Sequence, residues 1–241
     1  MCARVVSWIL PSWFLDTLFS LKEKKGTKNM RIIIDRANVS VEGGKVIIDL
    51  DSAQLANILN ANKVQLSTLK PKDEFKIGDE VFIVLKQSDN GTKVISKEFA
   101  YTNKVFGDCS DWKESPIRTL LNGDYYNKIA KLVGASNIIS MERDLTSLDG
   151  LDDYGTCNDK ISLLSASEYA KYHKILGLKS NYHDRWWTIT PVSTPSNDYS
   201  RFICYVGSSG VLYWSNCSYC FGVRPFLNLE PSILVSLNKD R

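Results

Sequence analysis

The sequence predicts an α+β fold built on an antiparallel sheet, with two to three helices. Strand patterns surround two tight turns near residues 78 and 90, and Asn90-Gly91 between apolar runs is a strong hairpin signal. Helical patterns with start and stop signals follow between residues 115 and 177, and strand patterns return from residue 186 onward. Strands, then helices, then strands favour an α+β fold over alternating βαβ units.

Composition and charge narrow the class of protein. The chain has 241 residues, 44% of them hydrophobic, which suffices for one large domain or two small ones with a buried core. The formal net charge is +3 and no basic cluster follows the first 30 residues, so nothing favours nucleic-acid binding. The two histidines, His173 and His183, exclude a His-rich metal site and disfavour Ser/His or Cys/His catalysis.

Four segments are expected along the chain. The leading apolar run is broken by Pro11 and Asp16, so it is too short for a membrane span, and it lacks a clean signal-peptide cleavage site. A basic stretch then precedes Met30, where we expect the folded part to begin. The segments are an N-terminal extension or docking segment at 1–29, a small accessory β/α region at 30–69, the main domain at 70–235 and a tail at 236–241.

Short strands and one helix are predicted in the accessory region. Apolar runs at 31–35 and 45–50 flank Gly43-Gly44, which is typical of a hairpin. A helical pattern capped by Ser52 then covers residues 52–60.

Residues 74–100 are predicted to form an antiparallel meander. Tight turns at Gly78-Asp79 and Asn90-Gly91 separate three apolar runs, and both turns suit hairpins. The expected strands are 74–77, 81–85 and 93–99.

Three helical patterns follow, each with a recognisable start. One has proline at the first helical position, and another has a capping box that ends in Glu168. Residues 137–160 lie between them, are rich in Asp, Gly, Thr and Ser, and are predicted to form one long surface loop. The helical segments begin at Ser115, Asp124 and Ser165 and end near Asn122, Gly134 and Gly177.

The last part of the chain is predicted to consist of strands. A Gly-Ser-Ser-Gly turn at 207–210 joins two of them. The expected strands are 186–190, 201–206, 211–214 and 223–229.

Six cysteines have irregular spacing that is too sparse for a disulfide scaffold, so free thiols are expected, some of them buried. Only Cys217 and Cys220 form a C-x-x-C motif. A zinc site there would need two more ligands, and no second C-x-x-C or paired His exists. The loop-like context of the motif disfavours a redox site. The cysteines are Cys2, Cys109, Cys157, Cys204, Cys217 and Cys220.

Four blocks of residues follow one another in the second half of the chain. They are W-x-x-S-x-I-R-x-x-L-N from Trp112 to Asn122, D-K-I-S-L-L-S from Asp159 ahead of Glu168, R-W-W-T from Arg185, and G-V-R-P from Gly222 ahead of F-L-N-L. In this order the blocks resemble a family of uncharacterised domains found in Gram-positive bacteria and their phages. The resemblance covers roughly residues 70–230.

The resemblance implies a fold and a setting. The family looks like a remote relative of the C-type-lectin-like fold shared by formylglycine-generating enzymes and phage receptor-binding proteins. The related variable proteins of diversity-generating retroelements carry a hypervariable surface just ahead of the terminal strand. The resemblance therefore implies a virion or bacterial cell-surface location after synthesis in the cytoplasm, and partners that are a protein or glycan on a cell surface, further copies of the chain, or other virion subunits.

Several residues within the blocks are interpreted as structural. Large aromatic side chains anchor a core, and an arginine can tie a loop carbonyl or carboxylate to a sheet. A glycine at 222 suits a positive φ or a close backbone approach, and proline at 225 suits the start of a strand. The residues are Trp112, Arg118, Trp187, Gly222, Arg224 and Pro225. Trp186 is interpreted as a further apolar anchor, and nothing in the sequence places Arg118 and Glu168 together.

Residues 196–221 are the predicted ligand-binding stretch, with an apolar framework made of Phe202 or Ile203 together with Val206 and Val211. Tyr and Trp give large contact areas at low entropic cost, and Ser and Asn give adaptable hydrogen bonds. An aromatic sheet face without a ligand is the alternative, because Tyr and Trp also favour strands. The proposed ligand-binding side chains are Tyr199, Arg201, Tyr205, Ser208, Ser209, Tyr213, Trp214, Ser215, Asn216, Ser218 and Tyr219.

Tyr, Asn, Ser and Cys are also the residues that adenine-directed mutagenesis of asparagine codons produces. Cys204, Cys217 and Cys220 lie in this stretch at positions that look exposed, which suits a diversified surface better than a fixed one. The sequence thus leads to the hypothesis of the variable protein of a diversity-generating retroelement.

The predicted function is non-catalytic ligand recognition with no cofactor. An acidic loop contains Asp149, Asp152, Asp153, Asn158 and Asp159, and such oxygen ligands suit calcium, although a solvated loop is the simpler interpretation. Two alternatives stay open. One is a structural or decoration protein of a phage particle; the other is a formylglycine-generating-type oxidase that would use Cys217 with Cys220 or with Cys204.

Overall fold

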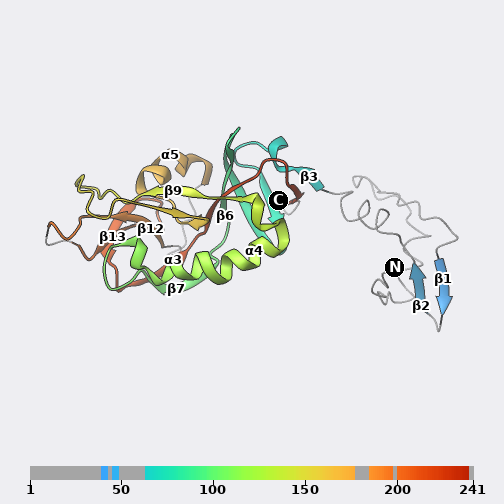
Figure 1. Ribbon diagram of the computed structural model, residues 1–241, viewed down its shortest axis with the longest axis horizontal. Helices are drawn as coiled ribbons and strands as arrows, with labels where there is room; N and C mark the ends of the chain where they lie inside the picture. The colour runs from blue at the N-terminus through green and yellow to red at the C-terminus, as the bar shows by residue number, and fades with distance from the viewer. Residues whose placement is uncertain (1–38, 43–44, 49–62, 177–184, 198–199, 239–241) are drawn as a thin grey trace. The chain divides into compact units, whose positions relative to one another are not determined.

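The computed structural model describes residues 39–42, 45–48, 63–176, 185–197 and 200–238 (Figure 1). The chain divides into two compact units, Met1–Asn62 and Lys63–Arg241. In the first unit, β1 (Val39–Glu42) and β2 (Lys45–Ile48) form an antiparallel hairpin with Glu42 opposite Lys45. The predicted extension at 1–29, the strand at 31–35, the helix at 52–60 and the end of the tail lie outside the described residues.

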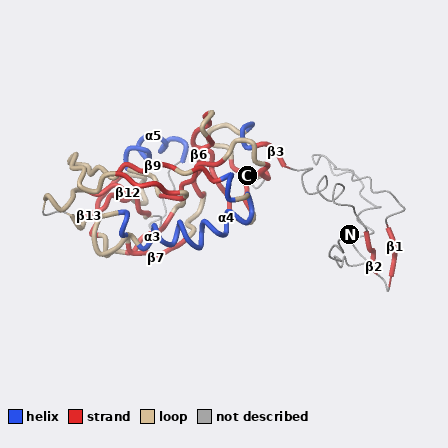
Figure 2. The backbone as a smooth tube through the Cα atoms, in the orientation of Figure 1, coloured by secondary structure: helices blue, strands red, loops and turns tan. Residues whose placement is uncertain are grey.

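The second unit confirms the prediction of an α+β fold with mostly antiparallel sheets (Figure 2). Its larger sheet has eight strands in the order β11-β16-β6-β5-β4-β17-β3, with β8 also paired to β16. These strands are β3 (Lys63–Gln65), β4 (Glu74–Ile77), β5 (Glu80–Ser88), β6 (Gly91–Ser96), β8 (Ile138–Ile139), β11 (Ile161–Ser162), β16 (Phe226–Leu229) and β17 (Leu234–Leu237). Residues 63–69, predicted as the end of the accessory region, therefore belong to this unit.

A five-stranded sheet completes the second unit, in the order β14-β13-β12-β15-β7. All of its pairs are antiparallel except β12 with β15. The strands are β7 (Tyr101–Val105), β12 (Trp186–Pro191), β13 (Phe202–Val206), β14 (Leu212–Asn216) and β15 (Cys220–Val223).

The meander at 74–100 is confirmed as β4, β5 and β6. Gly78 and Gly91 have φ values of 59° and 123° at its two turns, a region that glycine enters without steric cost. The 207–210 turn is also confirmed, because the Gly210 N–H donates to the Gly207 carbonyl and the Gly207 N–H to the Val211 carbonyl.

The first two predicted helices are one continuous helical segment. α3 (Pro116–Leu120) passes through a π-helical turn, η4 (Leu121–Tyr125), into α4 (Tyr126–Val133). Ser115 caps its start by accepting from the Ile117 N–H, and Gly134 ends it with a φ of 88°. Short 3-10 turns lie at η2 (Leu66–Thr68), η3 (Trp112–Glu114) and η5 (Ala135–Asn137).

The third predicted helix is α5 (Ala166–Leu176), and its capping box is confirmed. The Glu168 N–H donates to Ser165 Oγ at 3.1 Å, and the Ser165 N–H donates to Glu168 Oε2 at 3.0 Å. Two N–H groups that the helix leaves unpaired are thereby satisfied.

The prediction of one long loop at 137–160 was wrong. β9 (Met141–Asp144) and β10 (Thr156–Asp159) form an antiparallel hairpin inside it, in addition to β8. β9 alternates buried and exposed side chains, but Arg143 occupies one of the two buried positions. A charged residue on the inner face hides the period of two that identifies a strand.

The predicted strand 223–229 is two strands in two sheets. β15 ends at Val223 in the five-stranded sheet and β16 begins at Phe226 in the eight-stranded sheet. Arg224 and Pro225 carry the chain from one sheet to the other. Because proline has no N–H to donate, it suits this break between strands.

Two clusters of buried side chains form the core, and helices cover both. The larger contains Ile117, Leu121 and Ile129 from the α3–α4 segment, and the smaller contains Tyr169 and Tyr172 from α5. Figures 1 and 2 show α5 and the α3–α4 segment on opposite sides of the strands. The apolar face of each helical segment therefore packs on its own part of the core.

Gly222→Ala is expected to lower the free energy of unfolding by about 1–3 kcal/mol because it overpacks the interior. A Cβ atom at Gly222 would lie 2.6 Å from the Phe99 ring, so the close backbone approach predicted from the sequence is present. Urea unfolding measures the effect. Gly123→Ala is the control: its Cβ would meet nothing within 4 Å, and in a helical segment it should stabilise by up to about 1 kcal/mol. Equal effects of the two substitutions would contradict this interpretation.

Candidate recognition surface

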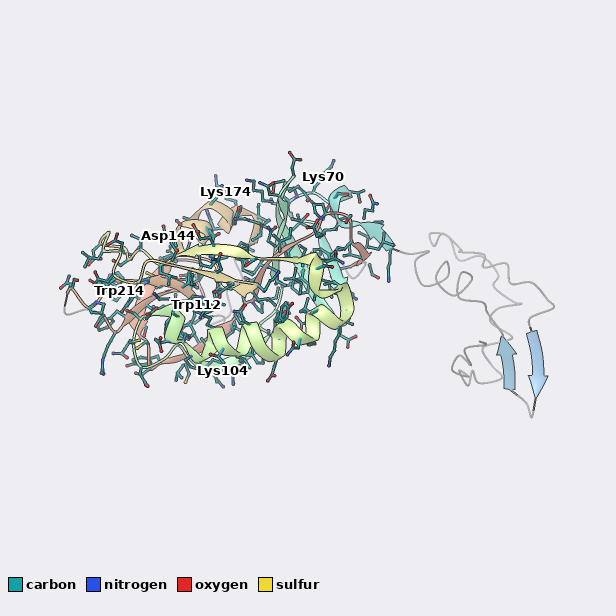
Figure 3. The ribbon with its side chains drawn as sticks, viewed as in Figure 1. Lys70, Lys104, Trp112, Asp144, Lys174 and Trp214 are labelled. Carbon is teal, nitrogen blue, oxygen red and sulfur yellow. The ribbon has the colours of Figure 1, made fainter. Side chains whose placement is uncertain are left out.

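The edge strand β14 and the turn after it carry the most exposed aromatic side chains in the described part of the chain. Trp214 is 65% exposed, Tyr219 62% and Tyr213 45%, while the other strongly exposed large hydrophobic side chains among the described residues are aliphatic. Tyr213 and Trp214 are neighbours on one strand, so they project from opposite faces of the sheet. We call Tyr213, Trp214 and Tyr219 the aromatic edge; Figure 3 labels Trp214.

Tyr213 is held by a stack of rings that leads into the core. Its ring stacks on Tyr205 with centroids 5.8 Å apart, and Tyr205 contacts Phe221 at 4.5 Å and the buried Trp187 at 6.3 Å. Gly207 leaves room for this stack, since a Cβ there would lie 2.8 Å from the Tyr213 ring. The exposed ring is therefore positioned by rigid neighbours, as in preorganised binding surfaces.

The structure describes ten of the eleven proposed ligand-binding side chains. Beside the aromatic edge, some are exposed and others are half-buried along the two strands. The exposed ones are Arg201, Ser209 and Ser218; the half-buried ones are Tyr205, Ser208, Ser215 and Asn216; Tyr199 lies outside the described residues.

Three expectations for this stretch were wrong. Val211, predicted as framework, is 50% exposed because it precedes an edge strand. Cys204 and Cys217, expected at exposed positions, are buried, whereas Cys220 is exposed. β13 lies inside the sheet, between β12 and β14, so its neighbours cover Cys204.

Burial alters the acidity of two of these thiols. It raises the pKa of Cys204 to about 12. It also raises the pKa of Cys217, and the nearby Cys109 adds to that shift. Cys109, Cys157, Cys204, Cys217 and Cys220 are free thiols. A raised pKa lowers the thiolate fraction at neutral pH, which opposes nucleophilic and redox chemistry.

Trp112 and Arg118 meet at one carboxylate. Trp112 Nε1 donates to Asp159 Oδ2 at 2.7 Å, and Arg118 Nε donates to Asp159 Oδ1 at 2.8 Å. Asn122 adds a second link, because its Oδ1 accepts from the Lys160 and Ile161 N–H groups. The first two sequence blocks thus form one structural junction between the helical segment and β10–β11.

Arg224 ties the crossover to β6. Its Nε and Nη2 atoms donate to the Ser96 carbonyl at 3.0 and 2.9 Å, and its guanidinium lies 5.1 Å from the centroid of the Trp186 ring. Trp187 is fully buried, and its Nε1 donates to the Lys104 carbonyl. These contacts give Arg224 and Trp187 the structural roles that the sequence predicts.

Sequence reasoning missed a second buried ion pair. Arg143 donates to Glu168 Oε1 at 3.1 Å and Oε2 at 2.5 Å, and also to the Leu163 carbonyl at 3.0 Å. The one indication of this pair is that Arg143 is buried in β9. The sequence gives no sign of that burial, because the stretch was predicted as a loop. Glu168 thereby serves as helix cap and counterion together.

The acidic loop is tied to its neighbours. Ser147, Ser193 and Asn197 donate to Asp149, while the pKa of Asp149 is lowered by these hydrogen bonds, Ser147 first. Asp159, another of the proposed calcium ligands, is buried at the interior junction and accepts from Trp112 and Arg118 there. Among the described residues, no three His, Cys, Asp or Glu side chains are gathered as a metal ion would require.

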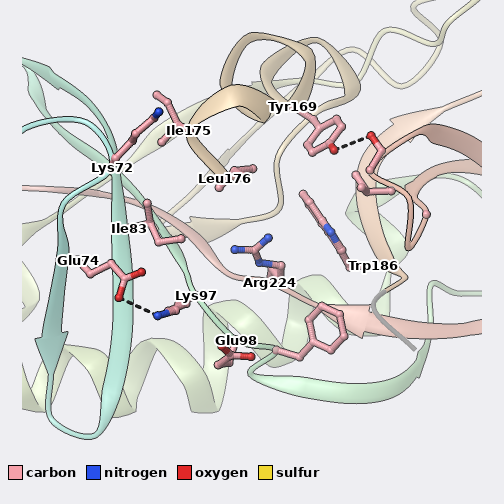
Figure 4. A pocket seen from close by; sticks show the side chains of 14 residues that line it. Lys72, Glu74, Ile83, Lys97, Glu98, Tyr169, Ile175, Leu176, Trp186 and Arg224 are labelled. Atoms are coloured by element: carbon pink, nitrogen blue, oxygen red, sulfur yellow. Dashed lines mark hydrogen bonds and ion pairs between the residues drawn. The ribbon is translucent and has the colours of Figure 1, made fainter. Parts of the chain in front are cut away.

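A cleft of about 200 Å³ lies between α5, the β4–β5 side of the larger sheet and the 207–210 turn (Figure 4). Arg224 lies at its centre beside Trp186, Lys97 pairs with Glu74 at 2.8 Å, and Tyr169 donates to the Gly210 carbonyl. Its described lining holds no Cys, His, Ser or Asp. The residues come from seven separate stretches of the chain, so sequence spacing gives no sign of the cleft.

Comparison with known proteins places the chain in a family. No curated protein and no solved structure matches it. No helix in the described residues is long and apolar enough to cross a membrane. A family model described as a domain of unknown function, DUF6273, matches residues 89–231, a stretch that contains all four sequence blocks. The chain therefore belongs to the DUF6273 family of domains of unknown function.

Proposed function

We propose that the chain is a non-catalytic recognition module that binds its partner through the aromatic edge. The observation that carries the proposal is the joint exposure of Tyr213, Trp214 and Tyr219 on one edge strand and its turn. Isolated exposed apolar residues are common, but adjacent exposed Trp and Tyr are typical of binding hot spots. A ring stack that continues into the core holds Tyr213 in place before any ligand arrives.

The sequence resemblance supports the same function and suggests its setting. The family that the blocks resemble looks in turn like a remote relative of the C-type-lectin-like fold, and in the related variable proteins the binding surface lies just ahead of the terminal strand. The aromatic edge lies just ahead of Gly222 and the G-V-R-P block. We propose a protein or glycan ligand on a cell surface and a phage- or bacterium-associated location.

The thiol chemistry gives the oxidase alternative no support. Such an enzyme needs a reactive cysteine pair, and the candidates are Cys204, Cys217 and Cys220. Burial raises the pKa of the first two, so each possible pair contains at least one thiol that ionises less readily than a free cysteine.

Trp214→Ala and Tyr219→Ala are expected to reduce ligand binding at least about tenfold, as substitutions at aromatic hot spots commonly do. Both side chains are largely exposed, so the free energy of unfolding should change by less than about 0.5 kcal/mol. Binding of the fluorescently labelled full chain to a glycan array and to a panel of intact bacterial cells measures the effect.

Leu132→Ala provides the matched control for this experiment. Leu132 is 53% exposed on α4, far along the chain from the aromatic edge, and its loss should leave binding unchanged. Equal binding by the wild type and both aromatic variants would refute the proposal, and so would the absence of binding to every cell and glycan tested.

A further inference from the structure

The free edges of the two large sheets differ in how well they are blocked. β3 is three residues long with an exposed Lys63, and β11 has only two residues. β7 has five residues but carries the exposed Lys104 (Figure 3) and Asn103 with a φ of 53°. Short strands, lysines and irregular backbone are devices that prevent an edge from pairing with another strand.

β14 has none of these protections. It pairs with β13 over five residues in an unbroken register from Phe202 opposite Asn216 to Val206 opposite Leu212. Residues 202–223 contain no charged side chain and no proline. Among the strands that the structure describes, β13 is its one neighbour. A regular, uncharged edge of this kind is a template for a further strand.

The hydrogen-bond pattern of the hairpin shows which backbone groups face outward. The Gly207 N–H donates to the Val211 carbonyl and the Cys217 N–H to the Arg201 carbonyl, so these residues form hydrogen-bonded pairs. Such pairs alternate with non-bonded pairs along an antiparallel ladder. Leu212 and Trp214 therefore direct their N–H and C=O groups away from β13, roughly 7 Å apart along the strand.

This arrangement fits an extended polypeptide. Two N–H and two C=O groups at a spacing of two residues match the outward groups of another strand. Tyr213 and Trp214 project from the two faces of β14 and can contact side chains of an added strand on both faces. The absence of charge on β14 favours a partner segment that is uncharged where it pairs.

We propose that β14 binds an extended, uncharged segment of another protein as a sixth strand of the five-stranded sheet. The inference rests on the proposed function and names the class of its ligand. A second copy of the chain fits less well. Antiparallel self-pairing about Trp214 would place Leu212 opposite Asn216, whose carbonyl already accepts from the Tyr219 N–H.

The test uses peptides selected on the full chain from a random ten-residue library displayed on phage. Leu212→Pro removes one outward N–H without breaking the ladder to β13, and it should weaken peptide binding about tenfold, as expected for one backbone hydrogen bond and its neighbours. Methylating the peptide amides one at a time should weaken binding at alternate residues and leave the intervening residues unaffected. This second readout does not depend on the folding of the proline variant.

Amide hydrogen exchange supplies a readout on the protein itself. In the free chain the Leu212 and Trp214 amides should exchange fast, and those of Tyr213 and Ser215 should exchange slowly, because only the latter bond to β13. A bound peptide should slow Leu212 and Trp214 selectively.

The outcomes separate this inference from the function on which it rests. Peptide binding that depends on Trp214 but not on alternate peptide amides would contradict the added strand and leave the proposed recognition function standing. Binding to glycans alone would have the same consequence. A dimer in sedimentation that Leu212→Pro dissociates would assign the edge to a second copy and overturn the inference. Binding of any ligand that neither Trp214→Ala nor Tyr219→Ala affects would overturn the proposed function as well.

Discussion

Replacing Asp159 with alanine is expected to lower the free energy of unfolding by about 3–5 kcal/mol, the cost of removing one partner of a buried ion pair. The Asp159 side chain is 1% exposed and accepts from both Trp112 Nε1 and Arg118 Nε. Its loss leaves the indole N–H of the fully buried Trp112 without its acceptor. It also leaves a guanidinium that is mostly shielded from water without its counterion. Urea unfolding followed by tryptophan fluorescence measures the change.

Two further variants make the Asp159 prediction specific. Asp159→Asn keeps an acceptor for the indole N–H but removes the charge. It should therefore lower the free energy of unfolding, but by less than Asp159→Ala does. Asp152→Ala removes an exposed carboxylate from the preceding loop and should leave the free energy of unfolding nearly unchanged. If Asp159→Ala unfolded at the same urea concentration as the wild type, the junction would have no stabilising role.

Arg143→Met is expected to lower the free energy of unfolding by about 3–5 kcal/mol at neutral pH, again because a buried charge loses its partner. Arg143 is 5% exposed and gives Glu168 two hydrogen bonds. The double variant Arg143→Met with Glu168→Gln removes both charges, so it should be more stable than Arg143→Met alone. A double variant as unstable as the single one would show that the pair is not electrostatically coupled.

The same pair makes stability depend on pH with a defined sign. Burial alone would raise the pKa of Glu168, but hydrogen bonds and charge from Arg143, with help from Ser165 and Lys93, outweigh burial and lower it. A folded-state pKa below the unfolded one stabilises the fold above the unfolded pKa, and this contribution is lost as pH falls through the folded pKa. In Arg143→Met only Ser165 and Lys93 still oppose the burial effect, so the pKa of Glu168 rises relative to the wild type. The loss in free energy of unfolding caused by Arg143→Met should therefore shrink between about pH 7 and about pH 4.

Local signals in the sequence predicted the elements whose defining hydrogen bonds join residues only a few positions apart in the chain. The Asn90-Gly91 turn, the Ser115 cap and the Ser165–Glu168 box are of this kind, and each is present. β9 was missed because Arg143 on its inner face is stabilised by Glu168, a residue 25 positions away. Sequence periodicity measures hydrophobicity along a segment, so it cannot recognise a charge that a distant partner makes acceptable in the core.

The candidate site was predicted in composition but not in exposure. Cys204 and Trp214 lie directly opposite each other on neighbouring strands, yet Cys204 is 2% exposed and Trp214 65% exposed. Both residues belong to strands with similar sequence patterns. Their exposures differ because β13 is an internal strand of the sheet and β14 is an edge strand. Strand order follows from pairing between distant segments, which a single sequence does not contain.

The position of the last two strands in the larger sheet bears on how the chain is made. β16 lies between β11 and β6, and β17 lies between β4 and β3, so both join segments synthesised much earlier. A nascent chain that has not yet released residues 226–237 from the ribosome has the apolar edges of β4 and β6 unpaired. The larger sheet therefore stays incomplete until residues 226–237 have left the ribosome, and premature termination before residue 226 should yield an aggregating polypeptide and not a smaller folded domain.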